Sequence, residues 1–221
     1  MSTREINPLP AHERRPDAPT VVHQHDDHAC AGMVGACGHG GTFADEEQFF
    51  RSLPEGHVVR TLMVEHTHIR RILDSLEAGA AALAARAGDV HVIARKMREG
   101  GEKLAAAEPH HVREEHVLFA ELEARGVFGP PQVMTAEHVE LRRMKHAVID
   151  TATALAGGDE SARMAAVEAA RAVVTNLRMH IAKENGILYP LALGVIRDDS
   201  VWQDMRRRCD AIGYCCTALH A

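Results

Sequence analysis

The sequence predicts an all-α protein: an antiparallel up-down-up-down four-helix bundle with an irregular N-terminal segment and a short C-terminal helix. Hydrophobic residues make up 46% of the 221 residues, enough for a core, but aromatic residues make up only 4%. Apolar residues recur every three or four positions in long stretches, as on the buried face of a helix, and strand-like alternation is rare. Short turns join these stretches, which is typical of an up-and-down bundle.

The pattern divides the chain into three parts. Residues 1–54 hold proline, glycine, histidine and cysteine with little apolar periodicity, so we expect an irregular His/Cys-rich segment there. The bundle is expected over residues 55–196. A C-terminal helix with a tail is expected over residues 197–221.

The first two helices have clear limits. The first is expected over 55–86 and ends before Gly88. The second is expected over 90–125, with two candidate break points inside it. Gly100-Gly101 weakens a helix, and Pro109 either kinks it or starts a new one.

The remaining helices follow turn signals. The GPP at 129–131 ends the second helical region, and a third helix is expected over 132–155. The GGDES segment at 157–161 is then a turn that provides the cap of a fourth helix over 161–195. A short helix is expected over 200–211.

Composition and charge restrict the class of protein. A formal net charge of −6 disfavours a nucleic-acid partner, which would need a basic face. No apolar run approaches the roughly 18 residues of a membrane span, and the start lacks the apolar stretch of a secretory signal. We therefore expect a cytoplasmic protein. Its cysteines are odd in number and cluster at the two ends, which does not indicate a disulfide framework: Cys30, Cys37, Cys209, Cys215 and Cys216.

Histidine is the unusual component, with 16 residues. His66, His138 and His180 each lie in the middle of an apolar stripe on a different predicted helix. Glu184 follows His180 by four residues and therefore lies on the same face. Buried polar and charged groups are costly unless they are paired or coordinated, so the pattern predicts a metal site inside the bundle.

The stretch HHVREEHVLF at 110–119 provides ligands from the remaining helix. Residues four apart are neighbours on a helix surface. Two pairs meet this condition, His110 with Glu114 and His111 with Glu115.

An internal repeat helps to choose between these pairs. The segment HHVREEHVLFAEL at 110–122 resembles HIAKENGILYPLA at 180–192. The alignment selects His110 and Glu114, whereas periodicity projected back from the following leucines slightly favours His111. We follow the repeat.

The predicted metal ligands are His66, His110, Glu114, His138, His180 and Glu184. Four imidazoles with two carboxylates suit a pair of transition-metal ions, with carboxylates able to bridge them. Such a set favours iron, manganese or zinc over calcium or magnesium, and the lack of thiolates disfavours a structural zinc site. The site leaves coordination positions open for water or a small ligand.

Four motifs together resemble the hemerythrin-type HHE cation-binding family over about residues 55–196: EHTHIRRIL, HHVREEHVLFAELEARG, AEHVELRRMKH and HIAKENGILYPLAL. Two further pieces, GVFGPPQVM and CDAIGYC, resemble a bacterial subfamily of it. The resemblance implies a four-helix bundle around two non-heme iron ions, zinc or manganese being less favoured. It implies O2, NO or peroxide as the small ligand, and Glu114 and Glu184 as bridges.

The sequence departs from the family pattern in three places. Oxygen-carrying hemerythrins have a second histidine four residues after the third-helix histidine, where this chain has Arg142, so the resemblance does not extend to reversible oxygen carriage. In the GPP subfamily the first-helix histidine lies earlier, which makes His57 an alternative to His66. The second-helix carboxylate of that subfamily lies one residue later, which favours Glu115.

The leading functional prediction is a di-iron protein that binds or turns over a small oxidant, with peroxide decomposition or another redox activity left open. The alternative is iron storage, iron delivery or repair of iron–sulfur clusters, for which HACAGMVGACGH at 28–39 offers additional His28, Cys30, Cys37 and His39 ligands. A structural metal site in an interaction module, with zinc as acceptable as iron, is a third hypothesis. The resemblance also implies a C-terminal tail that folds back toward the bundle, in which Tyr214 is expected to pack.

Overall fold

The structure is a computed structural model that describes residues 48 and 50–215. Within these residues the regular structure is helical and no strand occurs, which confirms the all-α prediction. None of the helices described is long and apolar enough to cross a membrane. The N-terminal segment that carries His28, Cys30, Cys37 and His39 lies outside the described residues. The limits assigned to the three parts of the chain stay predictions.

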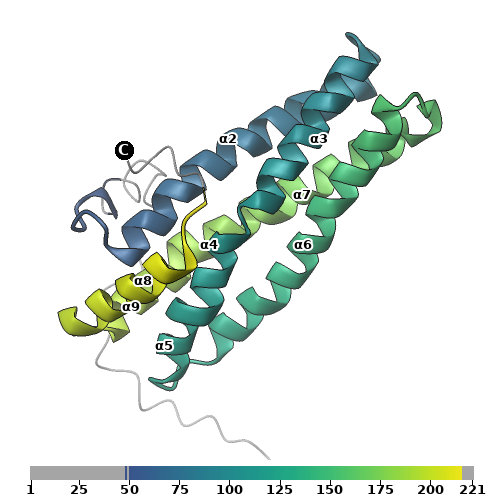
Figure 1. Ribbon diagram of the computed structural model, residues 1–221. Helices are drawn as coiled ribbons and strands as arrows, with labels where there is room; N and C mark the ends of the chain where they lie inside the picture. Colours follow the sequence, from purple (N-terminus) through teal and green to yellow (C-terminus); the bar gives the residue numbers. More distant parts are fainter. Residues whose placement is uncertain (1–47, 49, 216–221) are drawn as a thin grey trace, which may run out of the picture. The chain divides into compact units, whose positions relative to one another are not determined.

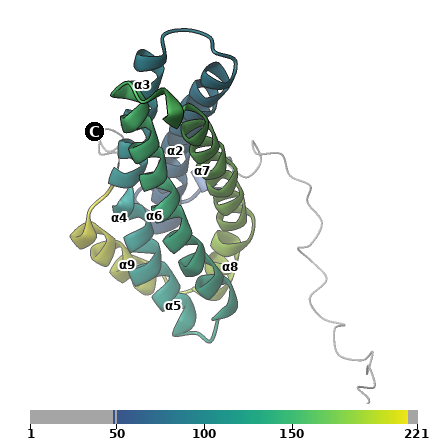
Figure 2. The same ribbon diagram turned by 90° about the vertical axis from the view of Figure 1, so that its right-hand side faces the viewer.

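Helices pack side by side into a bundle (Figures 1 and 2). Each of the long helices α2, α3, α6 and α7 contacts two of the others, because α2 and α6 both pack against α3 and α7. The helical columns are α2 (Val58–Ala84); α3 (Val90–Ala106) continued by α4 (Glu108–Arg113), η1 (Glu114–Phe119) and α5 (Ala120–Glu123); α6 (Gly129–Ala156); and α7 (Arg163–Lys183) continued by η3 (Glu184–Leu188) and α8 (Tyr189–Val195).

Helix starts follow local capping chemistry. The Asp89 carboxylate accepts hydrogen bonds from the first free N–H groups of α3, those of His91 and Val92. Before α7, the cap lies in the predicted turn: the Asp159 carboxylate accepts a hydrogen bond from the N–H of Ser161, inside the 3₁₀ turn η2 (Glu160–Ala162). The prolines of the GPP motif open α6 rather than precede it, since proline suits the first helical turn.

The glycine pair in α3 does not interrupt the helix, contrary to one of the two predicted break points. A Cβ atom added to Gly100 would lie 2.9 Å from Leu76 Cδ2, and one added to Gly101 would lie 2.9 Å from Ile149 Cγ1. The absence of side chains thus lets α3 approach α2 and α6 closely. The column breaks instead just before Pro109, which lies in the first turn of α4.

The core has two hydrophobic clusters with a polar layer between them. Along α2 the buried residues belong to one cluster up to Met63 and to the other from Ile69 onward. The other columns change cluster in the same way at the level of their buried histidines and glutamates. The fold therefore holds these polar side chains at one level, with apolar residues on both sides.

The C-terminal part covers the same level from outside. Helix α9 (Asp199–Ile212) packs against α2, α4 and η1. After it the chain turns back toward the bundle, as expected (Figure 1). The centroid of the Tyr214 ring lies 4.6 Å from the Arg113 guanidinium carbon. Cys215 is buried beside Glu65 and His110.

Candidate metal centre

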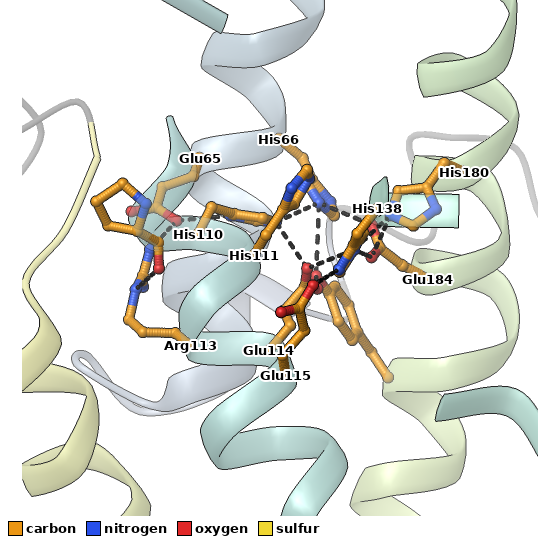
Figure 3. Close-up of polar contacts among 12 residues, drawn as sticks. Glu65, His66, His110, His111, Arg113, Glu114, Glu115, His138, His180 and Glu184 are labelled. Carbon is orange, nitrogen blue, oxygen red and sulfur yellow. Dashed lines mark hydrogen bonds and ion pairs between the residues drawn. The ribbon is translucent and has the colours of Figure 1, made fainter. Parts of the chain in front are cut away.

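The polar layer brings together five histidines and two glutamates, none more than 3% exposed: His66, His110, His111, His138, His180, Glu114 and Glu184. They come from all four helical columns and point toward one another (Figure 3). Burying so many ionisable groups is costly unless each has a partner.

A first group, which we call position A, contains His66, His110, Glu114 and Glu184. One ligand atom of each lies within 4.8 Å of the others. The Nε2 atoms of His66 and His110 are 3.1 Å apart. Glu184 Oε2 lies 3.2 Å from His66 Nε2.

A second group, position B, contains His111, His138 and His180, with the same two glutamates. The Nε2 atoms of His138 and His180 are 3.0 Å apart, and Glu184 Oε1 lies 2.9 Å from His180 Nε2. The His111 ring stacks on the His138 ring with centroids 3.9 Å apart. Glu184 therefore directs one carboxylate oxygen to each position, while Glu114 Oε2 lies 3.5 Å from both His110 Nε2 and His138 Nε2.

The hydrogen-bond partners of the outer ring nitrogens determine which nitrogen of each histidine carries the proton. Carboxylate and amide oxygens accept hydrogen bonds, so an Nδ1 beside one carries the proton and leaves the Nε2 lone pair free. Four histidines have this arrangement. His110 Nδ1 lies 2.7 Å from a Glu65 oxygen, and His138 Nδ1 lies 2.7 Å from a Glu115 oxygen. His180 Nδ1 lies 2.9 Å from a Glu137 oxygen, and His66 Nδ1 lies 2.9 Å from Asn185 Oδ1. Metal-binding histidines in proteins are oriented in this way.

Inside the layer, hydrogen-bond acceptors of the described residues face one another with no donor between them. Unprotonated Nε2 atoms point at each other in both positions, and Glu114 Oε2 and both Glu184 oxygens have no hydrogen-bond partner among the described residues. Such buried groups are destabilising unless a cation satisfies them. Neutral imidazole nitrogens and carboxylate oxygens form a donor set suited to transition metals. The residues present therefore fit two metal ions.

Burial and close charges shift the pKa values of the buried groups in different directions. Burial and the neighbouring Glu184 carboxylate raise the pKa of Glu114 well above its ordinary value. Glu184 is equally buried, but the imidazoles of His180 and His138 outweigh the desolvation and hold its pKa well below the ordinary value. Nearby carboxylates in turn outweigh burial and raise the pKa of His138 and of His180. Burial lowers the pKa of His110 to about 4, which leaves this imidazole neutral at pH 7, the form that binds a metal.

The contacts around position A recur around position B. Glu65 accepts from His110 and from Arg113, as Glu137 accepts from His180 and from Lys183. These outer carboxylates are absent from the predicted ligand set, although the sequence carries a signal for them: EHTHIRR at 65–71 matches EHVELRR at 137–143, with the glutamate directly before the buried histidine. The repeat found between 110–122 and 180–192 thus extends to the other two helices.

The two halves differ at a few positions. His111, which belongs to position B, has Ile181 as its counterpart in the repeat. Position B therefore has three imidazoles and position A has two. Tyr189, whose counterpart is Phe119, donates a hydrogen bond of 2.7 Å to Glu114 Oε1.

All six predicted ligands meet in this layer, but His110 and His111 were treated as alternatives and both are present. Glu115 is not an inner residue and instead accepts from His138 Nδ1. The internal repeat selects His110 and the periodicity favours His111, and each indicates one of the two buried histidines. Neither pattern alone gives both, because α4 starts anew at Pro109 and is followed by the π-helical turn η1, which has a wider repeat than an α-helix.

Two other candidates lie elsewhere. His57 is the N-cap of α2, where its Nδ1 accepts from Val59 N at 3.2 Å, and its ring lies 4.5 Å from the Trp202 ring. It takes no part in the cluster, so it does not replace His66. Tyr214 contacts Arg113 rather than the inner histidines.

Arg142, four residues after His138, binds carboxylates that lie outside the inner group. Its guanidinium forms ion pairs of 2.6 Å with Glu108 and 2.9 Å with Glu115. Arg142 thereby holds the carboxylate that orients His138. The third imidazole of position B comes from His111, on a different helix.

Comparison with known proteins places this geometry in context. Residues 57–192 match the family model described as "Hemerythrin HHE cation binding domain". The match spans well over half of the chain and includes every inner residue of the cluster. No curated protein matches the chain.

Proposed function

The chain belongs to the hemerythrin HHE cation-binding family, and from this premise we propose that it is a non-heme di-iron protein that binds or turns over O2, NO or peroxide. The observation that carries the proposal is two pairs of facing imidazoles beside carboxylate oxygens that have no hydrogen-bond partner among the described residues. The Nε2 atoms are 3.1 Å apart in one pair and 3.0 Å apart in the other. We propose with it the antiparallel up-down-up-down order of the four helical columns, which would bring one ligand set from each column to the same level.

The ligand roles follow from the distances. Glu184 would bridge the two ions, because its two oxygens face different positions. Glu114 would form a second bridge through Oε2. Position A, with two imidazoles, would keep more room for an exchangeable ligand than position B. When bound, the ions would supply Lewis-acid and redox chemistry to that ligand.

The protein's own contribution is orientation and exclusion of water. The outer partners of His66, His110, His138 and His180 fix each ring with its free nitrogen inward. The two hydrophobic clusters cover the layer on both sides, so a small ligand would meet an apolar, dry environment.

Metal analysis with an optical spectrum of protein purified from iron-supplemented cells tests this proposal. We expect two irons per chain and an absorption change on adding NO or peroxide. One tightly held zinc and no iron would contradict the proposal and favour a structural site. Full iron loading without any optical response to O2, NO or peroxide would contradict the ligand-binding part.

Ligand assignment is tested by His138→Ala and His180→Ala. Either change should remove most of the bound metal, because each imidazole belongs to position B. The exposed His146 provides the matched control, and His146→Ala should keep the full metal content. Retention of metal in the first two variants would show that the site is wrongly assigned.

Iron storage or delivery remains the second candidate, and the His/Cys-rich stretch at 28–39 is the feature that favours it. It requires iron that is released readily to an acceptor. Deleting residues 1–44 should then abolish transfer while the iron of the bundle stays bound. Iron that no acceptor removes would count against it.

A further inference from the structure

One difference between the two halves of the metal layer is a buried hydroxyl group. Tyr189 and Phe119 occupy the same place in the repeat, and each stacks on an inner histidine. The Tyr189 ring lies 5.7 Å from the His66 ring at an interplanar angle of 13°, and the Phe119 ring lies 5.8 Å from the His138 ring at 21°. The aromatic packing is thus matched, and the phenol oxygen is the difference.

This hydroxyl contacts the inner donors of position A. Tyr189 is fully buried, and its oxygen lies 2.7 Å from Glu114 Oε1 and 3.5 Å from His66 Nε2. Its hydrogen bond leaves Glu114 with only Oε2 free. Glu184, the other inner carboxylate, has no such donor and keeps both oxygens free.

A second difference coincides with the first. The third imidazole, His111, belongs to position B, and its counterpart Ile181 offers no donor. Position A is therefore the one with fewer protein ligands and also the one that faces a hydrogen-bond donor. Both differences point to the same position.

We propose that Tyr189 is a positioning residue: its hydroxyl fixes Glu114 Oε1 by a hydrogen bond and leaves only Oε2 for a metal ion. With Oε1 held in this way, Glu114 would not bind one ion at position A through both oxygens, and room for a small ligand would remain there. This inference rests on the proposed di-iron function.

Tyr189→Phe tests it, because the variant keeps the ring and removes only the oxygen. The probe is azide, added to the oxidised iron-loaded protein and followed by its optical absorption. The control is Tyr214→Phe, which changes the other of the two tyrosines in the chain, outside the inner cluster. Iron content is measured for each protein first.

We expect Tyr189→Phe to hold two irons and to bind azide roughly tenfold more weakly, the ratio that loss of a hydrogen bond to a charged group produces. Before azide is added, the absorption spectrum of iron-loaded Tyr189→Phe should also differ from that of the wild-type protein, because Glu114 would then be able to bind through both oxygens. Tyr214→Phe should behave as wild type. Equal azide affinity in wild type and Tyr189→Phe, or loss of iron from Tyr189→Phe, would overturn the inference.

The reciprocal variant keeps the test decisive if Tyr189→Phe does not fold. Phe119→Tyr adds a hydroxyl on the side of position B, where His111 is already a third imidazole. Its azide affinity should stay within about twofold of wild type. An effect as large as that expected for Tyr189→Phe would show that the hydroxyl does not act through position A. Wild-type protein without iron would refute the proposed function itself, which separates that failure from the failure of the inference.

Discussion

At the residue scale, two adjacent histidines belong to different groups of the buried cluster. His110 lies with His66 at position A, and His111 stacks on His138 at position B. Neighbouring side chains on a helix point about 100° apart, so one turn at the start of α4 can reach both sides of the centre. This turn therefore contributes one imidazole to each of the two groups.

Replacing His111 by isoleucine, the residue at its counterpart Ile181, should weaken the second metal ion. Position B then has two imidazoles, and we expect its affinity for iron to fall roughly tenfold or more. Metal titration of the purified protein measures the two affinities. His116→Ala, at an exposed histidine of η1, is the control. Unchanged affinity at both positions would exclude His111 as a ligand.

Lys145 is another residue with an unusual setting. It is 3% exposed, and no carboxylate of the described part of the chain forms an ion pair with it. Burial lowers the pKa of its ammonium group from 10.5 to about 8. The folded protein therefore bears the cost of a buried charge at pH 7, where the ammonium is still protonated.

Lys145→Met should stabilise the protein at neutral pH by roughly 2–3 kcal/mol. The folded-state pKa lies below the unfolded one, so the cost is complete below pH 8 and shrinks as pH rises toward 10.5. The difference in the free energy of unfolding between Lys145→Met and the wild-type protein should shrink over the same pH range. Urea unfolding at several pH values, at fixed metal content, measures it. Lys96→Met, at an exposed lysine, should show no such trend.

At the element scale, both ligand glutamates begin a π-helical turn. Segment η1 starts at Glu114 and η3 starts at Glu184, each four residues after an inner histidine. A π-turn changes the angular position of all residues that follow it. It therefore lets one helix direct a ligand pair to the centre and still present Leu118 or Leu188 to the apolar cluster beyond.

Two glycines in different elements should respond oppositely to substitution. Gly101→Ala should destabilise the protein by about 1–3 kcal/mol, because the new methyl group would lie 2.9 Å from Ile149 Cγ1. Gly186→Ala should stabilise it by about 0.5–1 kcal/mol, because alanine favours helix and a Cβ atom added at this position meets nothing within 4 Å. Urea or thermal unfolding at fixed metal content measures both. Equal effects of the same sign would contradict the assigned packing of α3.

At the scale of the whole molecule, the metal layer interrupts the core, so metal content and stability should be linked. Ions that bind only the folded state stabilise it by mass action, about 2.7 kcal/mol for each site at a hundredfold excess over the dissociation constant. Removing metal with a chelator should lower the unfolding midpoint of the wild-type protein. His138→Ala should start from a lower midpoint and respond less. An unfolding midpoint that does not change when the chelator is added would show that no ion is bound by the buried histidines and glutamates.

Much of this arrangement could be predicted from the sequence, because helix periodicity and the repeat both depend on local spacing. The six predicted residues meet for that reason. His111 beside His110 could not be predicted, since a proline restart and a π-turn change the faces of that column. The role of Tyr189 depends on packing between columns, which spacing within one helix does not determine. The role of Gly101 also depends on packing between columns. From the sequence alone it is a possible helix breaker, whereas in the structure it allows α6 to pack closely against α3.

The recurring contacts around positions A and B have a consequence for how such a protein can diverge. A helical hairpin carrying Glu65, His66, His110 and Glu114 would present the same donor set if it paired with a second copy of itself. Two identical copies, however, must change together. In one continuous chain each half accepts substitutions alone, and only then can one metal position gain an imidazole while the other gains a phenol.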